Sequence, residues 1–348
     1  KGTPLIVIDP REIELAEYAY VHLQLIPGTN VALFNGLAKI LHDNGDIDEP
    51  YLLERIENYE EFKGFIETIS LPEIVDSTGV DLESMKKAAS LICSSQAGGT
   101  LFVHGLGLSE LEQGTASVMT LCNLGMLTGS IGKLGSGMLP LRGQNNVQGS
   151  ADMGSMPDQF TGYQSVADPA ARQRLQKIWG SLPPEEPGLT IPEMIDAAAA
   201  GSIRGLWIQG EDIAQSDPNE SHVRAALETL DFLVVQEIFF SETCHFADVI
   251  LPAASYLEQE GTFTNGERRI QHVKPVVASP GESLPDWLVV RDAANLAGAQ
   301  WSYQNPSEVM DEIAEVAPHL FGGVSYSRLD QDGLQWPCTS YESSGTAT

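Results

Sequence analysis

The sequence lacks long apolar runs and has few basic residues. No run of about eighteen apolar residues occurs, so we expect no membrane-spanning helix and no membrane insertion. Lysine and arginine number 19 against 48 acids, which gives a formal net charge of −29. Because such a surface repels phosphate groups, neither nucleic acid nor an anionic lipid surface is an expected partner.

Cysteine is also scarce, and its spacing excludes the common metal motifs. The four cysteines lie far apart and form no C-x-x-C pair, so neither a zinc site nor an iron–sulfur cluster is supported. We expect reduced, mostly buried thiols, which favours the cytoplasm. The first residues, KGTPLIVIDPR, lack the layout of a signal peptide and begin on a strand-like run, so we expect a fragment or a processed chain.

Short apolar runs alternate with helical segments along most of the chain. This alternation predicts an α/β protein with parallel strands. Strands are expected at 4–9, 21–25, 100–104, 205–209, 232–236 and 248–251, and helices at 31–42, 82–93, 112–127, 168–179, 191–200, 219–230, 285–297 and 306–316. Between Gly129 and Gly162 the periodicity vanishes, and a loop this long is usually functional. The tail, 339–348, is small and polar and is expected to be loose.

Acidic residues follow several of the predicted strands. Asp9, Glu211, Asp212 and Glu237 all occupy such positions. In open α/β sheets the ligand crevice lies outside the carboxyl ends of the strands, where a carboxylate can accept hydrogen bonds from a ribose or a guanine. The alternative is a helix-capping or solvated acid, which is the commoner case for any one of them alone.

Two glycines follow the strand at 100–104. Gly105-x-Gly107 resembles the opening of a dinucleotide fingerprint, but the third glycine position holds Glu110. An NAD site of the usual kind is therefore not supported. The two glycines still allow a ligand to approach the backbone closely.

The most informative stretch is RGQNNVQGSADMG, residues Arg142–Gly154. It combines one arginine, whose planar fork suits a carboxylate or phosphate, with four side-chain amides, which can read the edge of a heterocycle. A buried polar loop that satisfies its own backbone explains the composition equally well. The seven histidines show no metal-ligand spacing, and His245, in SETCH, is expected to be a structural loop residue.

Taken in order, these motifs resemble the molybdopterin oxidoreductases, and within them the catalytic subunits of formate dehydrogenases. The resemblance is carried by VIDPR, HLQLIPGTN, HGLGLSE, LTGSIGKLGSG, RGQNNVQGSADMG, PDQFTGYQ, WIQGEDIAQSDPN, VVQEIFFSETCHFADVILPAASYLEQEGTFTNGERRIQ and GLQWPC, and it covers essentially the whole chain. It implies two doubly wound, Rossmann-like α/β domains that hold a bis-molybdopterin guanine dinucleotide with molybdenum or tungsten. Residues 1–144 would form the first domain in part and 145–256 the second, while 257–348 would be a returning segment that packs on an N-terminal domain outside this chain.

The resemblance also implies roles for particular residues. Arg142 would orient formate during its oxidation to carbon dioxide. The residues implied at the cofactor are Asp9, Arg11, Pro27, Gly28 and Asn30 at one guanosine end, Gly105, Gly107 and Gln144 near the pterin, and Gly210, Glu211, Asp212, Gln236, Glu237, Ser241, Glu242, Thr243 and Asp248 at the other guanosine end.

Some parts that the family uses are not found in this sequence. The ligands of its 4Fe–4S cluster, the metal-ligating cysteine or selenocysteine and the C-terminal β-barrel would lie outside it, so the chain alone is expected to be inactive. Electron-transfer subunits or an NAD-reducing partner would accept the electrons. Two alternatives remain at this point: another family enzyme such as a nitrate reductase, and the scaffold subunit of respiratory NADH dehydrogenase, which would predict an eroded pterin loop.

The charge balance leads to a first testable prediction. A diffuse acidic surface with few lysines fits adaptation to high salt, because counterions screen its self-repulsion. We expect the melting temperature to rise with KCl concentration. A protein that is most stable in low salt would contradict this interpretation and favour an ordinary acidic protein.

Overall fold

The computed structural model describes residues 2–94, 99–330 and 332–346, and the chain divides into two compact units. One unit runs to Arg142 and the other from Gly143 to Thr346. Within the described ranges, no helix is both long and apolar enough to cross a bilayer. The finer division into three segments at 144 and 256 stays a prediction.

The first unit contains two small parallel sheets. Strand β1 (Ile6–Ile8) pairs with β2 (Val21–Leu23), and the 3-10 helix η1 (Glu14–Tyr18) connects them. Strand β3 (Leu101–His104) pairs with β4 (Gly137–Pro140). The α/β class and the parallel direction are confirmed, although the strands form separate two-stranded sheets instead of one continuous sheet.

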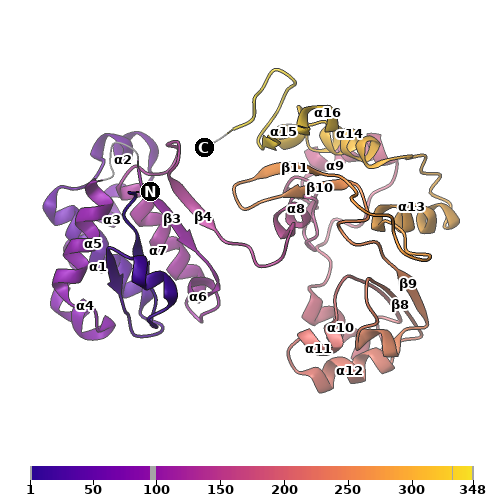
Figure 1. Ribbon diagram of the computed structural model, residues 1–348, viewed down its shortest axis with the longest axis horizontal. Helices are drawn as coiled ribbons and strands as arrows, with labels where there is room; N and C mark the ends of the chain where they lie inside the picture. The colour runs from indigo at the N-terminus through magenta and orange to yellow at the C-terminus, as the bar shows by residue number, and fades with distance from the viewer. Residues whose placement is uncertain (1, 95–98, 331, 347–348) are drawn as a thin grey trace. The chain divides into compact units, whose positions relative to one another are not determined.

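Helix α1 (Asn30–Asn44) is central to the first unit. It packs against α4, α5 and α7 (Figure 1). Leu33, Leu37 and Leu41 recur every four residues on one face and are almost fully buried, which is the spacing of an amphipathic helix. The other helices are α2 (Glu49–Arg55), α3 (Tyr59–Glu67), α4 (Leu71–Thr78), α5 (Leu82–Ser94), α6 (Leu106–Ser109) and α7 (Gly114–Leu127).

The second unit contains a parallel sheet of three strands, β7 (Gly205–Gln209), β8 (Phe232–Glu237) and β9 (Val249–Pro252). Leu233 and Val235 alternate along β8 and are buried in one apolar cluster with residues of α10 (Ile191–Ala199) and α12 (Glu220–Glu228). Between the strands lie the short helix α11 (Ile213–Ser216) and the 3-10 helix η2 (Thr243–Phe246). This part confirms the predicted strands and helices to within a few residues.

The stretch from Gly129 to Gly162, where no periodicity was found, is partly regular. It contains β4, helix α8 (Val147–Asp152) and the strand β5 (Gln159–Phe160), which pairs antiparallel with β6 (Gln164–Ser165). Helix α8 has no apolar face, because the side chains that it buries include Gln148 and Asp152. A pattern search for apolar residues therefore cannot find it.

Asp152 is the centre of a buried polar network. Its carboxylate accepts hydrogen bonds from Gln148 Nε2 at 2.8 Å, Tyr163 OH at 2.7 Å and Trp336 Nε1 at 2.8 Å. The side chain has no exposed surface. An unpaired buried carboxylate is costly, so the two donors from outside the helix, Tyr163 and Trp336, hold α8 against the rest of the unit.

An antiparallel sheet, β10 (Gly261–Thr264), β11 (Arg269–Val273) and β12 (Leu334–Gln335), was not predicted. Helix α8 lies against β10, and Asn146 Oδ1 accepts a hydrogen bond from Thr264 N at 2.9 Å. The remaining helices are α9 (Pro169–Trp179), α13 (Asp286–Leu296), α14 (Pro306–Val316), α15 (Pro318–Phe321) and α16 (Tyr326–Leu329).

The prediction of a loose tail is wrong as far as Thr346. Thr346 N donates to Gln335 O at 3.0 Å, and its hydroxyl donates to Pro337 O at 2.8 Å. Arg328 donates to the carbonyl of Ser343 and lies over the ring of Tyr341. This small, polar segment is therefore held in place by hydrogen bonds, many of them to its backbone. The last two residues lie outside the described part of the chain.

The cysteines agree with the prediction, since all four are free thiols. Cys244 and Cys338 are buried, and Cys93 and Cys122 are partly buried. A hydrogen bond to Asp46 and partial burial raise the pKa of Cys93 to about 11, so this thiol stays protonated at neutral pH.

Asp81 caps helix α5 and offers a test of this local structure. Its carboxylate accepts from Ser84 N at 2.9 Å and from Ser84 Oγ at 2.7 Å, and these bonds lower the pKa of Asp81. We expect Asp81→Ala to cost about 1 kcal/mol of unfolding free energy in urea titrations. The exposed Asp76 on α4 is the matched control, and an equal loss in Asp76→Ala would argue against a capping role.

Candidate functional site

The carboxyl edge of the β7–β8–β9 sheet gathers most of the residues implied in the second unit. Gln209 pairs with Gln236, and Glu237 with Pro252, so the three parallel strands end at one edge. The loop after β7 begins at Gly210, which has a φ of +66° and donates its N–H to Gln236 O at 2.9 Å. No atom lies within 4 Å of the place where a Cβ on Gly210 would be, so the backbone is open to a ligand.

Asp212 and Thr243 join the loops that follow β7 and β8. Asp212 Oδ1 accepts from Thr243 N at 2.8 Å and from Thr243 Oγ1 at 2.7 Å, while Thr243 Oγ1 accepts from Ala214 N at 3.1 Å. Burial opposes ionisation of Asp212, but the hydrogen bonds from Thr243 and Glu242 N outweigh it and lower the pKa of Asp212. An ionised carboxylate therefore fixes the shape of this edge.

Two further acids lie in the same loops. Glu242 forms an ion pair with Arg224, whose Nη2 lies 3.3 Å from Glu242 Oε2. Glu211 keeps exposed surface, yet partial burial and then the nearby charge of Asp217 raise the pKa of Glu211. Ser241 is partly buried, with its hydroxyl 3.5 Å from Cys244 Sγ. Glu211 and Glu242 both keep exposed carboxylates at this edge.

Gln236 and Glu237 differ in what they can reach. Gln236 has no exposed surface, and its amide donates to Asp286 Oδ1 at 2.6 Å, so its side chain positions the sheet and cannot touch a ligand as it stands. Glu237 is partly exposed, and one of its oxygens accepts from Ile238 N at 2.7 Å. Only Glu237 of this pair offers a reachable side chain.

Asp248 does not lie with the others. It precedes β9, and its Oδ2 accepts from Leu233 N at 2.7 Å, at the start of β8. Because the strands are parallel, this is the amino edge of the sheet, opposite to Gly210 and Glu237. The structure assigns the Asp248 carboxylate to the backbone of β8 and separates it from the other implied residues.

In the first unit, the β1–β2 sheet brings the implied residues of two loops to one edge. Ile8 pairs with Leu23, so the loop with Asp9 and Arg11 and the later turn at Pro27 and Gly28 follow the same edge. Arg11 N donates to Asp9 Oδ1 at 2.8 Å. The exposed Gly28, with a φ of +86°, makes the turn, whereas Asn30 is buried in the first turn of α1.

The β3–β4 sheet brings together Gly105, Gly107 and Arg142. His104 pairs with Pro140, and Leu141 N donates to His104 O at 2.7 Å, so both strands end together. No atom lies within 4 Å of a Cβ built on Gly105 or Gly107. Arg142 is exposed at this edge, and Gln144 is exposed in the second unit.

His104, the last residue of β3, was not among the predicted site residues. Its Nδ1 is buried and has no hydrogen-bond partner among the residues that the structure describes. The available signal was a polar ring at the last position of an apolar strand, directly before Gly-x-Gly. His104 was predicted only as part of the strand at 100–104.

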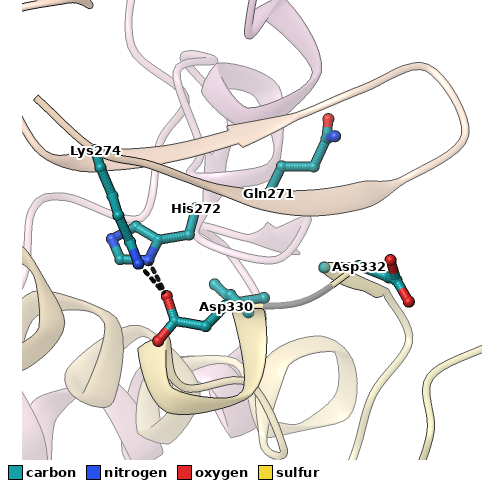
Figure 2. A pocket seen from close by; sticks show the side chains of 7 residues that line it. Gln271, His272, Lys274, Asp330 and Asp332 are labelled. Atoms are coloured by element: carbon teal, nitrogen blue, oxygen red, sulfur yellow. Dashed lines mark hydrogen bonds and ion pairs between the residues drawn. The ribbon is translucent and has the colours of Figure 1, made fainter. Parts of the chain in front are cut away.

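A hollow of about 510 Å³ lies elsewhere in the second unit, along β11 and beside α16. Figure 2 shows His272 and Lys274 both directed at Asp330, with His272 Nδ1 at 2.9 Å and Lys274 Nζ at 2.7 Å from it. The second ring nitrogen of His272 lies 2.8 Å from Glu260. None of the implied site residues lines this hollow, so it is separate from the candidate site. Within residues 2–94, 99–330 and 332–346, no group of three or more histidine, cysteine or acidic side chains could hold a metal ion.

The bond between Thr243 and Asp212 can be tested by stability. We expect Thr243→Val to cost about 1 to 3 kcal/mol at neutral pH, because the buried Ala214 N loses its acceptor and the ionised Asp212 loses a donor. The pKa of Asp212 is lowered in the folded state, so the stabilisation is present above its ordinary pKa and is lost as the pH falls through the folded value.

Thr243→Ser keeps the hydroxyl and serves as the control in urea titrations from neutral to acidic pH. The cost of Thr243→Val should therefore shrink in acid. A cost that is independent of pH, or equal in the two variants, would contradict the assigned contact.

Comparisons with known proteins agree with this arrangement. The family model of molybdopterin oxidoreductases matches residues 1–296. The chain is 42% identical over 348 residues to the F420-dependent formate dehydrogenase 2 subunit alpha of Methanococcus maripaludis, covering 99% of this chain and 51% of that protein. It is 38% identical to formate dehydrogenase H of Escherichia coli, covering 99% and 48%.

Among solved structures, acetylene hydratase from Pelobacter acetylenicus shares the fold, with a TM-score of 0.71 and 18% identity over 96% of this chain and 48% of that one. The chain thus spans about half the length of the curated relatives it matches. Because the family model covers most of the chain, the chain belongs to the molybdopterin oxidoreductase family.

Proposed function

We propose that this chain is part of the catalytic subunit of a formate dehydrogenase, which oxidises formate to carbon dioxide. The position of Arg142 carries the proposal. Arg142 follows β4 at the same edge of the sheet as Gly105 and Gly107, whose backbone is open to a ligand. The relatives named formate dehydrogenase extend over nearly the whole chain, including this edge.

The residues present fit a pterin dinucleotide in each unit. Open backbone at Gly105 and Gly107 in one unit, and at Gly210 in the other, leaves room for a ligand where a side chain would block it. The exposed carboxylates of Glu211 and Glu242 can accept hydrogen bonds from a ribose or a guanine. Asp9 and the turn at 27–28 provide the corresponding edge in the first unit.

Family membership implies a molybdopterin with molybdenum or tungsten, and we assign its form as the bis-guanine dinucleotide. When bound, this centre accepts the two electrons and the hydrogen that formate loses. Arg142 binds the formate carboxylate through its guanidinium fork and orients it. The positive charge also stabilises negative charge that develops beside the metal.

The remaining residues hold this arrangement in place. Asp212 and Thr243 tie two loops of the second unit together, so the ligand edge keeps its shape before cofactor binds. Electrons would leave through a 4Fe–4S cluster to electron-transfer subunits or an NAD-reducing partner in the cytoplasm.

Arg142 provides the direct test. In the complete enzyme, Arg142→Ala should lower kcat/KM for formate by about 10²- to 10³-fold, because one charged contact to the reacting group is lost. Metal and pterin contents should stay at the wild-type level. Arg204→Ala, which removes an exposed arginine paired with Asp231, is the matched control. Full activity in Arg142→Ala would remove the substrate role.

A further inference from the structure

His104 occupies the last position of β3, where the chain enters the Gly105–Gly107 loop. Side chains alternate along a strand, and Leu101 and Val103 are exposed whereas Phe102 is buried in the core of the first unit. His104 therefore shares the face of Phe102 and is half-buried. Its carbonyl accepts the bond from Leu141 N, one residue before Arg142.

The two ring nitrogens of His104 have different surroundings. Nδ1 is buried and has no hydrogen-bond partner in residues 2–94, 99–330 and 332–346. Orphaned buried N–H groups are rarer in proteins than under-satisfied acceptors, so the proton of a neutral imidazole belongs on Nε2. His104 thus presents an N–H donor at Nε2.

The Nε2–H group of His104 makes no hydrogen bond with another described residue of the protein. Nε2 does not share the complete burial of Nδ1. It belongs to the residue that precedes Gly105, where an added Cβ would meet nothing within 4 Å. A donor beside open backbone, at the edge that holds Arg142, is placed to meet a ligand rather than to stabilise the fold.

We propose that His104 Nε2–H donates a hydrogen bond to an acceptor atom of the pterin cofactor, a ring nitrogen, ring carbonyl or phosphate oxygen bound at the carboxyl edge of β3 and β4. The inference rests on the proposed function, because it takes the ligand at this edge to be a pterin dinucleotide. It adds a cofactor contact to the residues that the motifs of this chain imply.

Replacing His104 should change the thermal stability of the cofactor-free protein and the retention of the cofactor in opposite directions. His104→Phe keeps a planar ring but removes both nitrogens. The buried, unpaired Nδ1 disappears, so the cofactor-free protein should melt at the same temperature or higher. The Nε2 donor also disappears, so the complete enzyme should lose its pterin about threefold to tenfold faster during dialysis, the range of one neutral hydrogen bond.

The experiment uses the complete protein, once with cofactor and once produced in cells that cannot make the pterin. Molybdenum or tungsten is measured by mass spectrometry and the pterin by fluorescence after oxidation. His104→Gln restores a donor near the position of Nε2 and should retain cofactor close to the wild-type rate. His104→Leu gives the same comparison should a phenyl ring not be accommodated.

His42→Phe is the matched control, since this histidine lies in the last turn of α1 and contacts Asp43. It should leave the rate of cofactor loss unchanged. Wild-type retention in His104→Phe and His104→Leu, or equal losses in His104→Gln and His104→Phe, would overturn the proposal. Formate turnover is not used as a readout, so a different substrate would refute the proposed reaction and leave this result intact.

Discussion

Parallel strand pairing determines which loops of this chain lie together. Parallel strands share one direction, so the loops that follow them begin at the same edge of the sheet. At the carboxyl ends of the strands, Ile8 pairs with Leu23, His104 with Pro140, and Gln209 with Gln236. Residues that are remote in the sequence, such as Gly105 and Arg142, become neighbours along an edge for this reason alone. The apolar helices that cover the sheets serve to keep these short pairings intact.

Several acids at these edges have the structural role that was the alternative to ligand binding. Asp9, Asp212 and Glu237 each bond a nearby backbone N–H, which is the behaviour of a capping or loop-fixing acid. Glu211 and Glu242 keep exposed carboxylates in the same loops. A pre-shaped loop lowers the entropy that ligand binding must overcome, so under the proposed function the structural acids would prepare the loops in which Glu211 and Glu242 lie.

Much of the fold was predictable because it follows apolar periodicity. Leu33, Leu37 and Leu41 identify a helix, and FLVVQ identifies a buried strand. Helix α8 was missed because it buries polar residues whose partners, Tyr163 and Trp336, are distant in the sequence. The sheet β10–β11–β12 was missed for a related reason, since β12 joins it from about sixty residues away along the chain.

The site shows the same division between local and long-range information. Residue types and order pointed to Arg142 and the glycines, and their placement at one edge followed from strand direction. Side-chain burial and the edge at which a residue lies could not be predicted from the sequence. Gln236 faces the interior and donates a hydrogen bond to Asp286, and Asp248 lies at the amino edge of its sheet. His104 was missed because its significance lies in a nitrogen without a partner, which only three-dimensional packing defines.

The proposed function depends most on the form of the cofactor, which we propose to be the bis-guanine dinucleotide. Acid hydrolysis of the purified complete protein, followed by chromatography of the released nucleotides and metal analysis of the same sample, measures this directly. The account predicts two guanosine monophosphates for each molybdenum or tungsten atom. One nucleotide per metal, or a protein with neither nucleotide nor metal, would contradict it.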